Sequence, residues 1–309
     1  MLAVTFLGTS AARPTVERNV SSITVAREGE TLMFDCGEGT QRQMMRYGVS
    51  FTLRDIFFTH FHADHILGVT GLVRTLGLQG RTDPMCLHGP PGAKDVLGQA
   101  LTLGIERVPF EIEVKEIRAG ERLDRGDYDI EVFSTEHTRH SVGYAIVEHQ
   151  RLGRFDPEKA RALGIPEGPM WGMIHAGKSV TLEDGRTIGP EELVGPARSG
   201  RKVVLTGDTR PCESVAAAAE GADLLVHEAT FAQEEEDRAR ETGHSTAREA
   251  AQVALAARVR KLALCHLSAR YSRDFGPVLE EARAVFPEVV VAKDGMTIDV
   301  PFADAGSEG

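Results

Sequence analysis

The chain has 309 residues, 41% of them hydrophobic and 26% charged, which excludes a collagen-like, coiled-coil or wholly disordered protein. Because no run of 18 apolar residues occurs, we predict no membrane-spanning segment. The net charge of −11 repels nucleic acid as a whole, so any contact with RNA or DNA has to be local.

Short runs rich in Val, Ile and Phe alternate with helical patterns along the chain. They predict strands at Leu2–Leu7, Ser21–Ala26, Thr31–Asp35, Asp55–Thr59, Met85–Leu87, Phe110–Ile117, Asp127–Thr135, Gly143–Val147, Lys202–Thr206, Ala222–His227, Lys261–Cys265, Val289–Ala292 and Thr297–Val300. Helices are predicted at Gly39–Tyr47, Asp64–Leu76, Gly92–Leu103, Pro211–Glu220, Thr230–Arg240, Ser245–Ala257 (with Ser245 as N-cap) and Phe275–Phe286. The mixture of hairpins with strand–helix alternation favours two mixed sheets with helices outside.

The stretch from about 150 to 200 differs from the rest because Gly and Pro become frequent and strand signals nearly vanish. We expect a single domain, 1–309, in which this stretch is an inserted flexible arm without a second core. Residues 151–202 carry nine Lys and Arg against seven Asp and Glu. Their net charge of +2 leaves −13 for the remainder of the chain. The arm is therefore the extended stretch whose positive charge favours binding of RNA.

The four cysteines form no CxxC pair, and their surroundings are apolar or turn-like. They predict reduced, mostly buried thiols in a cytoplasmic protein. The first residues lack the basic start of a secretory signal and are more typical of a first β-strand.

Four side chains that bind metals occur within six residues of one segment. His60, His62, Asp64 and His65 follow the apolar strand 56–58. Histidines two apart in an extended segment point the same way. Imidazole nitrogens together with a carboxylate are typical of Zn²⁺ sites, with Mn²⁺ or Fe²⁺ as alternatives. The segment therefore predicts a metal centre rather than surface histidines at a polar strand end.

Further ligands are expected where other apolar strands end, at His137, Asp208 and His266. A lone histidine after a strand is more often structural, but three such residues beside the first segment favour one common site. Seven ligands are too many for one tetrahedral zinc. We therefore predict two metal ions that share a bridging carboxylate, each with an open position.

The pattern His60-x-His62-x-Asp64-His65, with later His, Asp and His residues, resembles the metallo-β-lactamase superfamily. Four further motifs resemble signatures of ribonuclease Z, its tRNA 3′-processing endonuclease family. These motifs are Phe34–Gln41 (FDCGEGTQ), His227–Thr230 (HEAT), Gly243–Thr246 (GHST) and His266–Tyr271 (HLSARY). The resemblance, which runs from Leu2 to about Val300, implies an α+β fold: an αββα four-layer sandwich with a projecting flexible arm and two metals at one edge of the sheets.

The resemblance also implies a role for each ligand. One metal would be held by His60, His62 and His137, and the other by Asp64, His65 and His266, with Asp208 bridging them. His140 is a rival to His137. The family's ligand lies six residues before a Gly-Tyr pair, here Gly143-Tyr144, which favours His137.

Three residues carry the expected proton chemistry. Asp64 would orient or deprotonate the attacking water, as the family assigns it. His244 would protonate the departing 3′ oxygen, and Glu228 would orient its ring. The structural alternative for His244 is a residue that merely precedes the helix capped by Ser245.

Contacts with RNA are expected near the metals and on the arm. Ser268, Arg270 and Tyr271 would contact a phosphate or the 3′ nucleotides, although a surface arginine and a packed tyrosine are the structural alternatives. Gly168-Pro169 matches a Gly-Pro motif of the family's arm. The arm's candidates for holding the tRNA elbow are Lys159, Arg161, Lys178 and Arg186.

One loop departs from the family pattern Pro-x-Lys-x-Arg-Asn. Pro14, Arg18 and Asn19 match, but Val16 stands where the lysine is expected. That loop is implicated in placing the cleavage site near the CCA end, so the resemblance does not define the cleavage position for this chain.

Together these features predict a zinc-dependent endoribonuclease that removes the 3′ trailer from precursor tRNA. It would leave a 3′ hydroxyl on the tRNA and a 5′ phosphate on the trailer. Two Zn²⁺ per subunit, with Mn²⁺ as the alternative, and a homodimer are implied by the family, and no other protein partner is predicted. The alternatives are a small-molecule zinc phosphodiesterase of the same fold and a non-catalytic RNA-binding subunit with a degenerate site.

Overall fold

The computed structural model describes residues 1–105 and 107–303, which fall into two units. The first, here called the body, contains Met1–Val147 and the chain from Arg201 onward. The second, here called the inserted unit, is Glu148–Gly200. The expectation of one domain with a flexible arm at about 150–200 stays a prediction, since it concerns motion and independent folding.

Two seven-stranded sheets form the centre of the body. The first has the order β16 (Thr297–Asp299), β1 (Leu2–Gly8), β2 (Ser22–Arg27), β3 (Glu30–Phe34), β4 (Asp55–Phe57), β5 (Met85–Gly89), β6 (Ile112–Glu116). The second has the order β15 (Val289–Val291), β14 (Leu262–Cys265), β13 (Leu224–Glu228), β12 (Lys202–Leu205), β9 (Val142–Glu148), β8 (Tyr128–Ser134), β7 (Arg122–Asp124). Both sheets are mixed, as predicted.

Each sheet contains one run of parallel strands. In the first sheet β3, β4, β5 and β6 are parallel, and in the second β12, β13, β14 and β15 are parallel. The carboxyl ends of parallel strands meet at one edge of a sheet, where functional loops gather. The strand-end residues predicted to bind metal therefore follow strands whose ends share an edge.

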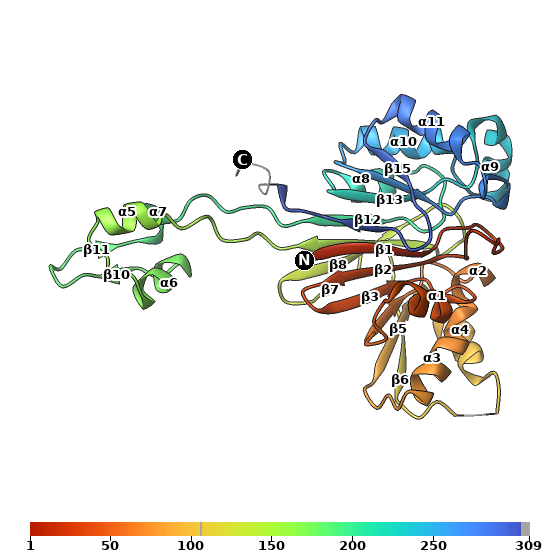
Figure 1. Cartoon of the computed structure of the whole chain (residues 1–309), viewed down its shortest axis with the longest axis horizontal. Helices are drawn as coiled ribbons and strands as arrows, with labels where there is room; N and C mark the ends of the chain where they lie inside the picture. The colour runs from red at the N-terminus through yellow and green to blue at the C-terminus, as the bar shows by residue number, and fades with distance from the viewer. Residues whose placement is uncertain (106, 304–309) are drawn as a thin grey trace. The chain divides into compact units, whose positions relative to one another are not determined.

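Helices cover the outer face of each sheet (Figure 1). The first sheet carries α1 (Thr40–Tyr47), α2 (Ala63–Ile66), α3 (Gly68–Leu78) and α4 (Ala93–Thr102) in its connections. The second carries α8 (Glu213–Ala219), η1 (Gln233–Glu235), α9 (Glu236–Thr242), α10 (Ala247–Ala256), η2 (Ala269–Tyr271) and α11 (Gly276–Val285). No helix in the described part of the chain combines the length and the apolar character needed to cross a bilayer.

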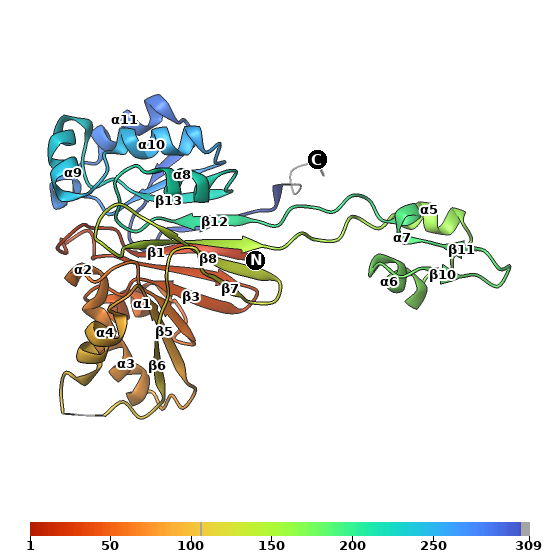
Figure 2. The same ribbon diagram turned by 180° about the vertical axis from the view of Figure 1, so that it is seen from behind.

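Three apolar layers hold the body together. Phe57 and Tyr144 belong to the layer between the sheets, where residues from both sheets meet. Val204 and Ala250 belong to the layer between the second sheet and its helices, and Ile56 and Leu72 to the layer under the first. The order helix, sheet, sheet, helix, visible from both sides in Figures 1 and 2, confirms the predicted αββα sandwich.

Two predicted helices differ from the structure. The helix predicted over Asp64–Leu76 is interrupted only at Leu67, which separates α2 from α3 although its φ of −64° and ψ of −19° are helical. At the start of α3, a β-carbon on Gly68 would lie 2.0 Å from the Gly37 carbonyl oxygen. The helix predicted from Thr230 begins as a 3-10 turn only at Gln233. Thr230 instead directs its hydroxyl to the side chains of the metal centre.

The predicted N-cap at Ser245 is wrong by one residue. Thr246 caps α10: its hydroxyl accepts from the Glu249 backbone N–H at 3.2 Å, and the Glu249 carboxylate accepts from the Thr246 N–H at 2.8 Å. Ser245 instead donates to the carbonyl oxygen of Thr209 at 2.6 Å. This bond ties the start of α10 to the loop after β12.

The inserted unit has its own secondary structure and a small apolar cluster. Its elements are α5 (Pro157–Ala162), α6 (Pro169–His175), β10 (Val180–Thr181), β11 (Thr187–Ile188) and α7 (Pro190–Leu193). Six buried apolar residues, among them Ile165, Ile174 and Ile188, pack together in it. This cluster differs from the expectation that the stretch has no core.

The charge of the inserted unit also differs from the expectation. Within Glu148–Gly200 there are seven Lys and Arg against eight Asp and Glu, a net charge of −1. The positive balance predicted for the arm depends on Arg201 and Lys202, which belong to the body. The inserted unit is therefore close to neutral.

Candidate metal centre

The predicted ligands converge from both sheets at one edge of the body. His60 and His62 follow β4, and Asp64 and His65 lie in α2. The other three lie after strands of the second sheet: His137 after β8, Asp208 after β12 and His266 after β14. Because β4, β12 and β14 end at the same edge, residues far apart in sequence become neighbours.

The first group of ligand atoms consists of three imidazole nitrogens and one carboxylate oxygen. Nδ1 of His62 lies 3.0 Å from Nε2 of His60 and 3.0 Å from Nε2 of His137. Oδ2 of Asp208 lies 3.6 Å from the His60 nitrogen and 3.7 Å from the His137 nitrogen. The four atoms thus surround one small volume.

The second group shares Asp208. Nε2 of His65 lies 3.4 Å from Nε2 of His266 and 3.6 Å from Oδ2 of Asp64. Nε2 of His266 lies 3.3 Å from Oδ2 of Asp64 and 3.4 Å from Oδ1 of Asp208. Oδ2 of Asp208 also lies 3.3 Å from Nε2 of His65, so the Asp208 carboxylate contacts both groups.

The donor set fits divalent metal ions. Nitrogens held at 2.0–2.1 Å in a tetrahedral site are about 3.3 Å apart, close to the separations in both groups. Oδ1 of Asp208 is buried without a hydrogen-bond donor among the described residues, although buried carboxylate oxygens are normally satisfied. Clustered imidazole nitrogens around a buried carboxylate are the chemistry that Zn²⁺ or Mn²⁺ satisfies.

The electrostatics of the groups agree with ligand chemistry. Burial lowers the pKa of His60 well below its usual range and also lowers the pKa of His137, so both rings are neutral and can bind through nitrogen. Burial alone would raise the pKa of Asp208, but His266 and His65 hold that pKa well below its usual range. The shared carboxylate is therefore ionised.

Most of the histidines are fixed by a second partner, which sets the nitrogen that faces the metal site. Asp35 binds Nδ1 of His65 at 2.7 Å, and the Gly243 carbonyl oxygen binds Nδ1 of His137 at 2.9 Å. The Thr59 hydroxyl lies 3.0 Å from Nδ1 of His60, and the Thr230 hydroxyl lies 2.9 Å from Nδ1 of His266. Four histidine rings are therefore oriented by a partner at Nδ1: His60, His65, His137 and His266.

Sequence reasoning missed Asp35 and Thr230 in these roles, although both lie in motifs that it singled out. Asp35 directly follows β3, so an acidic residue at a strand end was a usable signal. Its φ of 56° and the φ of 53° at His266 lie in the left-handed region that few residues other than Gly and Asn adopt. Such strain is concentrated at functional sites.

The loop after β1 reaches the metal centre through its backbone. The Ala12 N–H donates to Oδ2 of Asp64 at 2.7 Å, a contact that no side-chain pattern could reveal. The loop is anchored by the buried Arg18, which donates to the Thr9 hydroxyl and to the Ala292 carbonyl oxygen. Val16, where the family pattern has Lys, is 92% exposed and takes no part in this anchoring.

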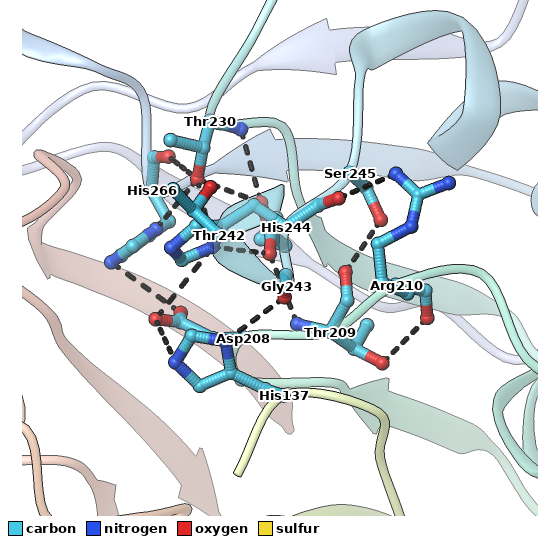
Figure 3. A network of polar contacts seen from close by, with 12 residues as sticks. His137, Asp208, Thr209, Arg210, Thr230, Thr242, Gly243, His244, Ser245 and His266 are labelled. Atoms are coloured by element: carbon cyan, nitrogen blue, oxygen red, sulfur yellow. Dashed lines mark hydrogen bonds and ion pairs between the residues drawn. The ribbon is translucent and has the colours of Figure 1, made fainter. Parts of the chain in front are cut away.

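His244 stands beside Asp208, His137 and His266 (Figure 3) and pairs with a further carboxylate. Its Nδ1 lies 2.8 Å from Oε1 of Glu228, which is buried at the end of β13. Burial alone would lower the pKa of His244, but the Glu228 carboxylate raises it to about 9. The ring is therefore protonated at neutral pH, and its Nε2 can donate a proton.

The predicted RNA-contact residues lie in different surroundings. Ser268 precedes η2 and lines a cavity beside His244. Arg270 pairs with Glu235, and the Tyr271 hydroxyl donates to the same carboxylate at 3.1 Å and accepts from the Ala232 N–H. Tyr271 is only 7% exposed, so its ring is packed rather than presented to solvent.

Of the remaining predicted residues, one lies in the body and the others lie in the inserted unit. His140 is exposed and is not among the grouped ligand atoms, whereas its rival His137 is. Gly168 and Pro169 begin α6 in the inserted unit, and Lys178 is exposed just after that helix.

Known proteins match the chain over nearly its whole length. The family model described as anti-Pycsar protein Apyc1 matches residues 2–153, and that of the beta-lactamase superfamily domain matches residues 184–267. Ribonuclease Z of Gemmatimonas aurantiaca is 58% identical over 98% of this chain and 97% of its own length.

Solved structures match the fold. Human tRNase Z, short form, superposes with a TM-score of 0.70 and 28% identity, over 97% of this chain and 100% of that chain. The metallo-β-lactamase fold protein YhfI from Bacillus subtilis superposes with a TM-score of 0.67 and 21% identity, over 96% and 98% of the two chains. The fold is thus the predicted metallo-β-lactamase fold, and on its identity to the curated relatives the chain belongs to the ribonuclease Z family.

Proposed function

We propose that the chain is a metal-dependent endoribonuclease that removes the 3′ trailer from precursor tRNA. The observation that carries this proposal is the pair of ligand groups sharing Asp208, next to the His244–Glu228 pair, in a member of the ribonuclease Z family. The products are a 3′ hydroxyl on the tRNA and a 5′ phosphate on the trailer.

The proposed ligands divide as the two groups do. His60, His62 and His137 would hold one divalent ion and Asp64, His65 and His266 the other, and Asp208 would contribute to both. Zn²⁺ is the ion that these nitrogen-rich sets favour, and Mn²⁺ is the alternative. When bound, such ions lower the pKa of water and stabilise negative charge on phosphoryl oxygens.

The side chains supply the proton transfers. Asp64, with Oδ2 held by the Ala12 N–H, orients the attacking water and accepts its proton. As the water oxygen bonds to phosphorus, the bond from phosphorus to the 3′ oxygen breaks. Nε2 of His244 gives its proton to that oxygen, and Glu228 holds the imidazolium through Nδ1.

A test of this function uses a precursor tRNA that carries a 3′ trailer. We expect metal-dependent cleavage at the trailer junction, abolished by a chelator and restored by Zn²⁺ or Mn²⁺. Asp64→Ala should reduce the rate by at least the roughly 10²–10⁴-fold typical of losing an acid–base group, with tRNA affinity retained. The matched control, Asp95→Ala, removes an exposed carboxylate from the first turn of α4 and should leave the rate unchanged. Hydrolysis of small phosphodiesters without cleavage of the precursor would contradict the proposal.

The metal sites give a second prediction, at Asp35. Asp35→Asn removes the charge that orients His65 while keeping the shape of the side chain. We expect metal affinity to fall by about 10–100-fold, because partners of ligating histidines contribute that much. Metal content after dialysis against graded chelator measures this directly, with Asp83→Asn, an exposed loop residue, as control. Unchanged affinity would mean that His65 is not a ligand.

The inserted unit is proposed to contact the tRNA through a few residues around Gly168, Pro169 and Lys178. Arg161 is paired with Glu158 and Glu167, and Arg186 with Asp184. Lys159 and Lys178 are exposed, and no acidic partner is found for their ammonium groups among the described residues. Of the four predicted basic residues, these two are the better candidates for phosphate contacts.

Replacing Lys159 and Lys178 together by Ala should raise KM for precursor tRNA and leave kcat nearly unchanged, since the lost contacts bind ground state and transition state alike. The slope of log binding against log salt should fall by about one per lost phosphate contact. The control replaces Arg161 and Arg186, whose charges are already paired. A fall in kcat with an unaltered salt slope would mean that these lysines act on the catalytic site instead.

The proposed assembly is a homodimer in the cytoplasm. Leu78, Leu103 and Ile105 are 91%, 58% and 97% exposed near the ends of α3 and α4, a surface that a second copy could cover. The four cysteines are free thiols, which is typical of a reducing compartment.

A further inference from the structure

Arg210 holds the backbone of the proposed proton donor (Figure 3). It lies two residues after Asp208, in the loop that follows β12. Its Nη1 donates to the His244 carbonyl oxygen at 2.7 Å and to Oε2 of Glu249 at 3.0 Å, and its Nη2 donates to Oε1 of Glu249 at 2.5 Å. The guanidinium therefore binds the carboxylate through both Nη atoms and still has an N–H for the carbonyl group.

The ion pair between Arg210 and Glu249 is largely shielded from water. The two side chains are 19% and 12% exposed, so solvent weakens this pair less than a surface pair. The Glu249 carboxylate also accepts from the Thr246 N–H at 2.8 Å, as part of the cap of α10. One carboxylate therefore fixes both the start of α10 and the guanidinium that holds His244.

The backbone of Arg210 is tied to the segment that carries a proposed metal ligand. The Arg210 N–H donates to the Glu136 carbonyl oxygen at 2.8 Å, and the Glu136 N–H donates to the Thr209 hydroxyl at 3.0 Å. Glu136 directly precedes His137, whose Nδ1 lies 2.9 Å from the Gly243 carbonyl oxygen. The contacts thus run from Arg210 through the ligand segment to Gly243, and the guanidinium closes the circle at the next residue.

Different partners hold the ring and the backbone of His244. Glu228 holds the ring at Nδ1, and the Ala239 carbonyl oxygen accepts from the His244 N–H at 2.8 Å. Arg210 holds the carbonyl group on the other side of the residue. Because the ring moves with the backbone that carries it, the position of Nε2 depends on all three contacts. A misplacement of about 1 Å at a reacting group can cost about 10²-fold in rate.

We infer that Arg210 is a positioning residue for the proposed proton transfer and that it acts through His244. It keeps Nε2 of that ring at the departing 3′ oxygen, so that the proton leaves Nε2 as the bond from phosphorus to that oxygen breaks. The inference rests on the proposed function, because it uses His244 as the proton donor. The competing role for Arg210 is to position the ligand segment around His137, which the same contacts also reach.

The test removes the pair without leaving a buried charge. Arg210→Met combined with Glu249→Gln does this, and the glutamine side chain can still accept from the Thr246 N–H. The matched control combines Arg258→Met with Glu220→Gln, which removes an exposed pair just beyond the other end of α10. Thermal unfolding and bound metal are measured for each protein. Should the double variant not fold, Arg210→Lys replaces it, because an ammonium keeps the charge but cannot bind the carboxylate as a planar fork.

Two substrates separate proton transfer from metal binding. Precursor tRNA releases a 3′ oxygen that needs a proton, whereas bis(p-nitrophenyl) phosphate releases p-nitrophenolate, an anion that is stable at neutral pH without one. For precursor tRNA we expect the double variant to lower kcat by roughly 10–100-fold, with KM nearly unchanged. Its kcat for bis(p-nitrophenyl) phosphate should change by less than about threefold, and its bound metal should equal that of the wild type. The control should match the wild type on both substrates.

His244→Ala provides an internal check on the path of the effect. It should show the same selective loss for precursor tRNA. Adding the substitutions at Arg210 and Glu249 to His244→Ala should lower the rate little further, because residues that act as a unit are not additive.

Three results would overturn the inference. Equal losses on both substrates, or loss of bound metal, would assign Arg210 to the ligand segment. The other two are an undiminished kcat for precursor tRNA and a full further loss in the His244→Ala background. While the wild type cleaves precursor tRNA, any of these results refutes the inference alone and the proposed function stands. A wild type that hydrolyses bis(p-nitrophenyl) phosphate but not precursor tRNA would refute both.

Discussion

The carboxylate of Asp208 is the constraint on which the rest of the centre depends. It is 3% exposed, and its oxygens lie within 3.7 Å of imidazole nitrogens of both ligand groups. Its position requires a close approach between the loops of the two sheets. The preceding Gly207 has φ 62°, and a β-carbon there would lie 2.7 Å from Cβ of Thr59, the residue before His60. A larger residue at position 207 would push apart the ligands that the two sheets contribute. The packing of the two sheets therefore determines the distances between the metal ligands.

A buried carboxylate surrounded by imidazoles is costly unless its partners are fixed. The body meets this requirement with partners from its own loops, two neutral and one charged: the Thr230 hydroxyl on His266, the Gly243 carbonyl oxygen on His137, and the Asp35 carboxylate on His65. Each contact uses the ring nitrogen that faces away from the site. The other nitrogen is left directed inward, toward the other ligand atoms.

The sequence predicted the ligands because their signal is local: His60 and His62 alternate on an extended segment, and His137, Asp208 and His266 each follow an apolar strand. The two sheets with outer helices were predicted from another local signal, the alternation of strand-like and helical segments along the chain. Contacts made by the backbone carry no such signal. The hydrogen bond from the Ala12 N–H to Asp64 occurs at an alanine with a left-handed φ of 59°, which the sequence does not indicate. The helix cap is a similar case: Ser245 and Thr246 are both good N-caps, and only the contact of Ser245 with Thr209 decides between them. The charge of the inserted unit was mispredicted because its boundary, two residues before Lys202, was not visible in composition.

The distribution of charge explains how an acidic chain can act on RNA. Repulsion at long range is screened within about 8–10 Å at physiological salt, so a few arginines near the metals can outweigh a distant negative surface. The arginines that count are those without a carboxylate partner, because a paired guanidinium such as Arg210, held by Glu249, has little left to offer a phosphate. Near the centre, Arg13 and Arg238 line a cavity whose described lining residues include no Asp or Glu, while Arg210, Arg240 and Arg270 are each paired with a carboxylate. Pairing, and not only the number of basic residues, therefore determines which guanidinium groups are available to a phosphate.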